Sequence, residues 1–325
     1  MDSIPLISII IPVYNVEKWI EKSLNSALKQ TYSNIEYIIV DDCGSDKSMD
    51  IVNSIIQSNP KKLIRIIRHD KNMGLSEARN SGLRAAKGTY VFFLDSDDEI
   101  SEDCIEIHLS VLQDSDADFS DGNVRMVGVG HSNFHVYNST HCFVNGDILL
   151  EYFNSLHVCG WNKLIRRSFL LDNDIFFRPG MLYEDMLWSY QLCKNSKRYV
   201  TIPSETYYYL IRQGSITTQN KDSAHSVKQF NSFVELLQCM RNEFQMPTNK
   251  ELIRLQSKWF NRILLIIKTR LLDAPLNRND KKFFFRELMV FSDFAVGPIK
   301  YIHKLPFNAF TILFTIPNKI FRKIR

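Results

Sequence analysis

The chain has 325 residues, of which 45% are apolar and 23% are charged, a composition that excludes a disordered, collagen-like or low-complexity protein. Its length allows one large α/β domain with an appendage, or two domains. The net charge of +4 hides an asymmetry, because residues 241–325 hold 17 Lys and Arg against 6 Asp and Glu, whereas residues 1–240 hold 23 against 30.

The first hundred residues alternate between apolar runs, typical of buried strands, and segments with helical apolar spacing. Strands are expected at residues 7–13, 35–40, 63–68 and 90–94, and helices near 19–28, 49–56 and 74–86. Asn15 is expected to cap the first helix. This alternation predicts an α/β fold with a parallel sheet, whose ligands bind at the carboxyl ends of the strands.

Three of the four predicted strand ends carry polar side chains. Tyr14-Asn15 follows the first strand, Asp41-Asp42 the second, and Asp95-Ser-Asp-Asp the fourth. Neither a Gly-x-Gly-x-x-Gly sequence after the first strand nor a P-loop sequence is present, which weakens dinucleotide and P-loop interpretations. For Asp41-Asp42 an ordinary turn remains the structural alternative.

The acidic cluster after the fourth strand concentrates negative charge. Asp95, Asp97 and Asp98 repel one another unless they are protonated or neutralised, and Mg²⁺ or Mn²⁺ prefers such oxygen ligands. A metal held there would clamp a diphosphate and stabilise it as a leaving group. A solvated loop that caps the next helix is the alternative.

Four blocks of sequence, at residues 8–15, 39–45, 72–82 and 88–98, resemble the family 2 glycosyltransferases in residues, order and spacing. The resemblance implies a Rossmann-like nucleotide-binding sheet of the glycosyltransferase A type in residues 1–100. Residues 101–221 would complete the catalytic domain with the acceptor side and the base. Cys43 is an additional residue between Asp42 and Gly44, where the family often has Asp-Asp-Gly-Ser, so the loop is expected to bulge there.

The resemblance also implies roles for the donor-binding residues. Pro12, Tyr14 and Asn15 would line the base site together with Asp42, which would read uracil; Tyr14 could equally cover the core.

The same resemblance places further residues on the ribose and diphosphate. Asp95 would meet the ribose, and Asp97 with Asp95 would hold the Mn²⁺ or Mg²⁺ cofactor. Arg79 would lie near the nucleotide, or else pair on the helix surface with Glu77 or an aspartate. Residues 207–217 resemble the family's flexible closing segment, in which Arg212 would offset phosphate charge, with a surface loop as the alternative.

A Glu-Asp pair supplies the candidate base. Glu184 and Asp185 precede a segment with helical apolar spacing, where carboxylates are also favoured by the helix dipole. The resemblance assigns the pair as general base, with Asp185 preferred over Glu184. The base takes the proton from an acceptor hydroxyl, and direct displacement would invert the anomeric centre.

The rest of the acceptor half is less informative. Trp161 and Trp188 are expected either to form an acceptor platform or to pack in the core. The region 120–129 and the surroundings of Phe143 are expected to be strands or an insertion. A solvated loop is expected for the acidic residues Asp114, Asp116, Asp118 and Asp121.

Residues 222–325 are expected to form a basic, mainly helical C-terminal region. Aromatic residues alternate with Lys and Arg from residue 300 onward, which favours an anionic membrane surface, with helical packing or a homodimer as alternatives and nucleic acid disfavoured.

These features together predict an inverting glycosyltransferase. The resemblance implies a UDP-hexose or UDP-N-acetylhexosamine as the donor and, by analogy, a saccharide or a lipid-linked oligosaccharide of cell-surface polysaccharide synthesis as the acceptor. A nucleotidyltransferase acting on a sugar phosphate, or a non-catalytic nucleotide-sugar-binding protein, is the alternative. Six scattered cysteines and an N-terminus without a signal peptide predict a cytoplasmic protein, or one peripheral on the inner face of the membrane.

Overall fold

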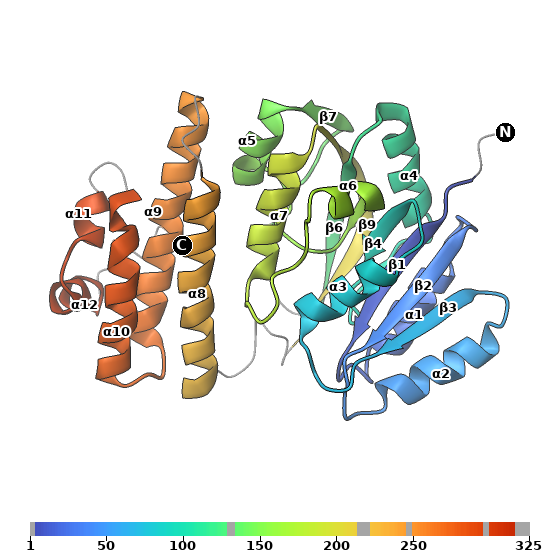
Figure 1. Cartoon of the computed structure of the whole chain (residues 1–325), viewed down its shortest axis with the longest axis horizontal. Helices are drawn as coiled ribbons and strands as arrows, with labels where there is room; N and C mark the ends of the chain where they lie inside the picture. The colour runs from blue at the N-terminus through green and yellow to red at the C-terminus, as the bar shows by residue number, and fades with distance from the viewer. Residues whose placement is uncertain (1–3, 129–133, 213–221, 245–248, 295–298, 316–325) are drawn as a thin grey trace. The chain divides into compact units, whose positions relative to one another are not determined.

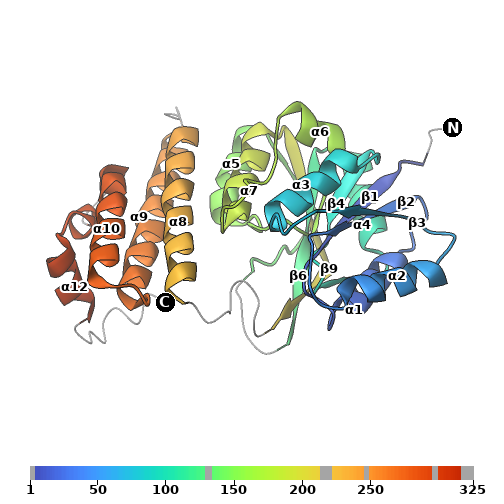
Figure 2. The ribbon, with the colours of Figure 1, turned by 60° about the horizontal axis from the view of Figure 1, so that its bottom comes forward.

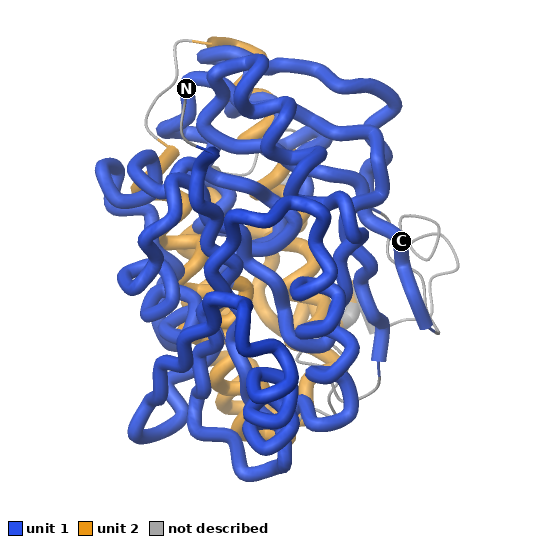
Figure 3. Tube along the Cα trace, turned by 90° about the vertical axis from the view of Figure 1, so that its right-hand side faces the viewer, with its two compact units in different colours: residues 1–180, 184–218 blue, residues 181–183, 219–325 orange. Residues whose placement is uncertain are grey.

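The computed structural model describes residues 4–128, 134–212, 222–244, 249–294 and 299–315. The chain divides into two compact units, the first with residues 1–180 and 184–218 and the second with residues 181–183 and 219–325 (Figure 3). The predicted boundary between residues 221 and 222 differs from this division by residues 181–183 and 219–221. We call these parts the catalytic unit and the helical unit.

The first part of the catalytic unit has the alternating pattern expected from the sequence. The four strands are β1 (Ile7–Val13), β2 (Ile35–Asp41), β3 (Leu63–Arg68) and β4 (Tyr90–Phe93), and the helices between them are α1 (Ile20–Leu28), α2 (Ser48–Ser58) and α3 (Leu75–Ala85). All pairings among these strands are parallel, in the order β3-β2-β1-β4. The continuous apolar runs are explained by burial, since β1 is buried along its whole length.

The second part of the unit extends the sheet with antiparallel and parallel neighbours. Its order continues from β4 through β8 (Lys163–Arg166), β6 (Phe119–Gly128) and β9 (Arg198–Ile211) to β5 (Glu99–Ile100), and β7 (His141–Val144) pairs with β9. The helices of this part are α4 (Cys104–Ser115), α5 (Gly146–Asn154), α6 (Arg167–Asp172) and α7 (Glu184–Asn195). The expected strands near residues 120–129 and 143 are therefore β6 and β7.

Helices cover both faces of this sheet (Figures 1 and 2). The core on one face joins side chains of β1 and β4 to α1, α2 and α4, as with Ile11, Leu24 and Leu109. On the other face α3 packs so closely on β1 that a Cβ at Gly82 would lie 2.3 Å from Ile10 Cγ2. The ring of Trp188 from α7 meets Phe93 of β4 on that same face.

The expectation of a solvated loop around Asp121 is wrong. Asp121 is fully buried in β6, where its Oδ1 lies 3.3 Å from Lys163 Nζ and its Oδ2 accepts a hydrogen bond from the Tyr137 hydroxyl at 2.7 Å. These contacts hold the pKa of Asp121 well below its usual range although desolvation alone would raise it. Asp121 therefore joins β6 to β8 as half of a buried ion pair.

The helical unit is built from α8 (Ser223–Glu243), α9 (Lys250–Asp273), α10 (Arg278–Met289), a 3-10 turn (Val290–Phe294), α11 (Ile299–His303) and α12 (Phe307–Thr315). Asp222, Asn249 and Asn277 cap α8, α9 and α10 by accepting hydrogen bonds from backbone N–H groups. Its core is rich in Phe and Leu, with Phe230, Leu264 and Phe284 buried. The mainly helical C-terminal region predicted from the sequence is confirmed.

The segment 181–183 packs on α8 within the helical unit. The ring of Tyr183 stacks on Phe233 with 4.7 Å between centroids, and the N–H of Leu182 donates to Ser232 Oγ at 3.0 Å. Within the described residues, no helix combines the length and the apolar character needed to cross a bilayer.

Candidate active site

The three polar strand ends meet at one edge of the sheet. β1 lies between β2 and β4 and is parallel to both, so the residues after Val13, Asp41 and Phe93 emerge side by side. This is the edge at which parallel α/β sheets bind ligands. The juxtaposition expected from the sequence is therefore present.

The loop after β1 is fixed to the loop after β2. The side chain of Asn15 accepts a hydrogen bond from the N–H of Ser45 at 2.8 Å, and the N–H of Val16 donates to Ser48 Oγ at 2.8 Å. The expectation that Asn15 caps the first helix is wrong, since α1 begins after Trp19 without a side-chain cap. Asn15 instead organises the rim of the candidate site, with a positive φ of 51°.

Asp42 is buried at the base of this rim. Its Oδ1 accepts from the N–H of Met73 at 2.8 Å and lies 2.7 Å from His69 Nδ1, while its Oδ2 accepts from the N–H of Gly74 at 2.9 Å. These bonds fix the loop before α3. Three neighbours thus occupy most of the acceptor positions of the Asp42 carboxylate, whose side chain is 3% exposed.

The other residues predicted for the base site differ in exposure. Pro12 is buried in β1, whereas Tyr14 is 45% exposed beside the strand ends. Cys43 has a positive φ of 59°, which is uncommon for a residue with a side chain, so the chain turns sharply after Asp42, as the extra residue led us to expect. A planar ring available to stack on a base is thus present at this edge.

The three carboxylates after β4 have separate partners. Asp95 Oδ1 accepts from Arg79 Nη2 at 2.6 Å, and Asp97 Oδ2 accepts from Arg212 Nε at 2.7 Å. Asp98 is buried and accepts from the Tyr207 hydroxyl and the Leu210 N–H, both at 2.8 Å. Asp98 therefore ties the acidic turn to β9, whereas Asp95 and Asp97 remain partly exposed.

Desolvation and the neighbouring Asp95 raise the pKa of Asp97, and the guanidinium of Arg212 and a backbone hydrogen bond oppose them. The crowding of negative charge predicted from the sequence is therefore real. Arg212 supplies the neutralising cation, and its guanidinium also lies 4.0 Å from the centroid of the Trp19 ring.

The structure describes residues 207–212 of the flexible closing segment expected at residues 207–217. Tyr207, Tyr208 and Tyr209 belong to β9, and Tyr207 is fully buried, so the expectation is wrong for them. Arg212 follows the strand directly, and residues 213–217 lie outside the described residues.

The candidate base pair opens α7. Glu184 and Asp185 form its first turn, as the helical spacing predicted, and Glu184 Oε1 accepts from Arg79 Nη1 at 3.0 Å. Burial raises the pKa of Asp185 to about 7, with a further contribution from the Glu184 carboxylate and an opposing one from Arg79. A carboxyl group with a pKa near neutrality is suited to general base catalysis.

The expectation that the two tryptophans form an acceptor platform is wrong. Trp188 is 1% exposed and stacks on Phe177 with 4.5 Å between centroids. Trp161 is 6% exposed and stacks on Tyr207 and Tyr209 at 4.4 and 5.3 Å. Both rings contribute to the core, the alternative that the sequence left open.

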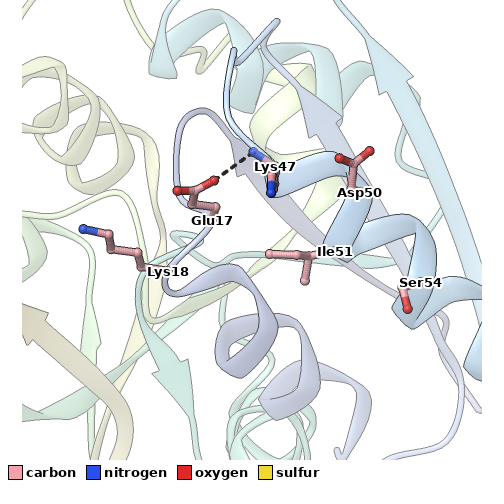
Figure 4. A pocket seen from close by; sticks show the side chains of 6 residues that line it. All are labelled: Glu17, Lys18, Lys47, Asp50, Ile51 and Ser54. Carbon is pink, nitrogen blue, oxygen red and sulfur yellow. Dashed lines mark hydrogen bonds between the residues drawn. The ribbon is translucent and has the colours of Figure 1, made fainter.

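An open hollow of about 540 Å³ lies between the loop after β1 and helix α2 (Figure 4). Its lining contains none of the predicted site residues, and a hydrogen bond from the Lys47 N–H to Glu17 crosses it at 3.0 Å. The candidate site is therefore defined by the strand ends rather than by this hollow.

A divalent metal is compatible with the donor set at Asp95 and Asp97. Within the described ranges, no three His, Cys, Asp or Glu side chains group together as metal ligands. Two carboxylates at a strand end are nevertheless the set expected for Mn²⁺ or Mg²⁺, which takes further oxygens from substrate phosphates. Asp97 already pairs with one cation, the Arg212 guanidinium, at 2.7 Å.

Comparison with known proteins shows the family and the fold of this chain. The chain is 29% identical to glycosyltransferase GlyG of Streptococcus pneumoniae over 222 residues, which cover 65% of this chain and 72% of GlyG. Its structure is similar to that of Staphylococcus aureus TarS 1–349 in complex with UDP-GlcNAc, with a TM-score of 0.73, 22% identity and coverage of 90% and 82% of the two chains.

A more distant structural relative is the mannosyltransferase PcManGT of Pyrobaculum calidifontis in complex with GDP-Man and Mn²⁺, with a TM-score of 0.58, 14% identity and coverage of 98% and 83%. The sequence profile described as Glycosyl transferase family 2 matches residues 8–176, which is more than half of the chain. The chain therefore belongs to glycosyltransferase family 2, and it is a glycosyltransferase with the type A fold.

Proposed function

We propose that this glycosyltransferase transfers a sugar from a UDP-hexose or UDP-N-acetylhexosamine to a hydroxyl of a saccharide or lipid-linked oligosaccharide, with inversion. The observation that carries the proposal is the bridge formed by Arg79, which joins Asp95 at the end of β4 to Glu184 beside Asp185. A donor held at the strand ends would thus present its anomeric carbon near a carboxylate with a raised pKa. Membership of the family sets aside the nucleotidyltransferase and non-catalytic alternatives.

The donor assignment is supported by the exposed ring and the fixed carboxylate near β1. Tyr14 would stack on the uracil, and the remaining acceptor position of Asp42 would take a hydrogen bond from it. TarS, a structural relative, was solved with UDP-GlcNAc, which supports UDP as the nucleotide.

Tyr14→Ala is expected to weaken UDP binding, because stacking of a base on an aromatic ring contributes about 1–3 kcal/mol. Isothermal titration calorimetry should show a dissociation constant raised about tenfold. Tyr32→Phe, which alters a hydroxyl bonded to the Pro5 carbonyl, is the control and should leave UDP affinity unchanged. Equal affinity for UDP in Tyr14→Ala would remove the stacking role.

The mechanism that we propose uses Asp185 as the base. The acceptor hydroxyl loses its proton to the Asp185 carboxylate as its oxygen attacks the anomeric carbon, and the bond to the diphosphate oxygen breaks. Glu184 and Asp95 are committed to Arg79, so Asp185 is the carboxylate of this group best placed to accept the proton. Mn²⁺ or Mg²⁺ held by Asp97 and Asp95 would stabilise charge on the diphosphate.

A single displacement reverses the configuration at the anomeric carbon. With water as the acceptor and an α-linked UDP-sugar as the donor, the first sugar released should be the β-anomer, observed by proton NMR before mutarotation. An initial α-anomer would point to two successive displacements and would contradict the assignment of Asp185 as a base.

A membrane-surface role for the helical unit is supported by one face of α10. Lys282, Phe283 and Arg286 are exposed on one side of α10, and Val290, which directly follows the helix, is exposed as well. A basic and aromatic face suits an anionic lipid surface. This surface would bring the catalytic unit to a lipid-linked acceptor.

Co-sedimentation with phosphatidylglycerol vesicles tests the membrane role. Replacing Lys282 and Arg286 by Ser should weaken binding roughly 30-fold, since each cation contributes about 1 kcal/mol near an anionic surface. Binding to neutral phosphatidylcholine vesicles with equal strength, or no loss in the double variant, would contradict it.

A further inference from the structure

The guanidinium of Arg79 is a deeply buried charged group of the candidate site. Its side chain is 2% exposed, Nη2 donates to Asp95 at 2.6 Å, and Nη1 donates to Glu184 at 3.0 Å. Desolvation alone would lower the pKa of Arg79, but these two carboxylates raise it, so the side chain stays charged. One rigid cation therefore connects the end of β4 with the start of α7.

The ring of Phe177 also contacts this guanidinium. Arg79 Cζ lies 4.9 Å from the centroid of the Phe177 ring, and the backbone of Phe177 is held by both ends of the Asn80 amide at 2.8 and 2.9 Å. Asn80 follows Arg79 in α3, so its two hydrogen bonds fix the Phe177 ring relative to this helix.

A glycine completes the space around Arg79. A Cβ at Gly160 would lie 3.0 Å from Arg79 Nη1 and 2.9 Å from Phe177 Cε1, both closer than such contacts normally allow. A side chain at this position would force the guanidinium or the ring to move. The observed position of Arg79 therefore depends on the absence of a side chain at residue 160.

We propose that Arg79 is a positioning residue, which orients the Glu184–Asp185 turn of α7 relative to the donor-side carboxylate Asp95. This inference rests on the proposed function and replaces the earlier expectation that Arg79 binds the nucleotide. A residue that contacts a phosphate needs an accessible cation, whereas Arg79 is buried and both of its terminal nitrogens donate to carboxylates. Its effect on catalysis passes through Glu184, the neighbour of the base.

Arg79→Lys tests this assignment, because lysine keeps the charge but lacks the planar fork that bridges two carboxylates. We expect kcat for UDP release to fall about 100-fold, the loss that follows from misplacing a catalytic group by about 1 Å, with the dissociation constant of UDP unchanged. Arg84→Lys is the matched control on the same helix, since Arg84 is exposed and pairs with Glu77 at the surface. A raised dissociation constant of UDP with unchanged kcat would overturn the proposal in favour of nucleotide binding.

A second readout does not depend on turnover. Hydrogen–deuterium exchange of the ligand-free protein should be faster at residues 184–187 in both Arg79→Lys and Gly160→Ala, and unchanged in α1. Unaltered exchange at 184–187 in a folded Arg79→Lys protein would overturn the positioning role. If the wild type neither binds UDP nor releases it from any donor, the proposed function fails, whereas this exchange experiment still decides the role of Arg79.

Discussion

Asp185→Asn is expected to lower kcat about 10²- to 10⁴-fold, the usual contribution of a positioned general base. The amide keeps the shape of the side chain but cannot take the proton of the acceptor hydroxyl. Asp185 lies in the first turn of α7, next to Glu184, and not at the strand ends where UDP would bind. The affinity for UDP should therefore stay the same. The measurement is steady-state UDP release by coupled assay, with UDP binding followed by calorimetry.

Asp172→Asn is the control for that experiment, since Asp172 is an exposed carboxylate at the end of α6. Its kcat should equal that of the wild type. If Asp185→Asn retained most of its activity while Glu184→Gln lost it, the base would be Glu184 and the order of the pair would be reversed.

The pH profile gives an independent view of the same residue. Burial and the Glu184 carboxylate raise the pKa of Asp185 to about 7, and only the ionised form accepts a proton. The value of kcat/KM should therefore be constant above this pKa and fall about tenfold per unit as the pH drops below it. A profile that stays flat down to pH 5 would show that no group with this pKa acts as the base in the free enzyme.

Asp97→Ala is expected to abolish the effect of Mn²⁺ on UDP binding and to lower kcat/KM about 10²- to 10⁴-fold. A metal on the diphosphate contributes several kcal/mol to stabilising the leaving group, and Asp97 is a partly exposed carboxylate whose pKa is raised by desolvation and by Asp95. Calorimetric titration of UDP with Mn²⁺ or with EDTA should give the same dissociation constant in the variant and different constants in the wild type.

Asp103→Ala is the matched control for the metal experiment, because Asp103 is an exposed carboxylate close in sequence that makes no side-chain cap to α4. It should keep the Mn²⁺ dependence of the wild type. Persistence of that dependence in Asp97→Ala would mean that Asp97 serves only to hold Arg212.

The strands of the first hundred residues could be predicted closely from the sequence because three of them, β1, β2 and β4, are almost entirely buried. The apolar runs of β1 and β3 coincide with the observed strands, and the parallel order follows from the alternation with helices. The polar residues that follow β1, β2 and β4 could also be predicted to lie together, because neighbouring parallel strands end at the same edge of the sheet.

The sequence did not reveal the partners of individual polar residues. Asp121 resembles its solvated acidic neighbours until the fold brings Lys163 within 3.3 Å of it. Arg79 meets Glu184, which lies 105 residues further along the chain, through a space that depends on Gly160. No local pattern encodes such contacts, because the first arises from the pairing of β6 with β8 and the second from the packing of α3 and α7 on the same face of the sheet.

The aromatic residues show the same limit. Trp188 has the helical spacing of a core residue as well as the chemistry of a sugar platform, and only its stacking on Phe177 decides between them. Tyr207 is part of β9, where its hydroxyl donates to Asp98. A run of three tyrosines before Arg212 was therefore a strand that braces the acidic turn.

The central claim is that this glycosyltransferase uses a UDP-sugar with a divalent metal. The most direct measurement is UDP release from a panel of UDP-hexoses and UDP-N-acetylhexosamines, each with Mn²⁺ and with EDTA. We predict release from one donor with Mn²⁺, and loss of that release with EDTA. Release from none of the UDP-sugars, together with no binding of UDP in the presence of Mn²⁺, would contradict the account.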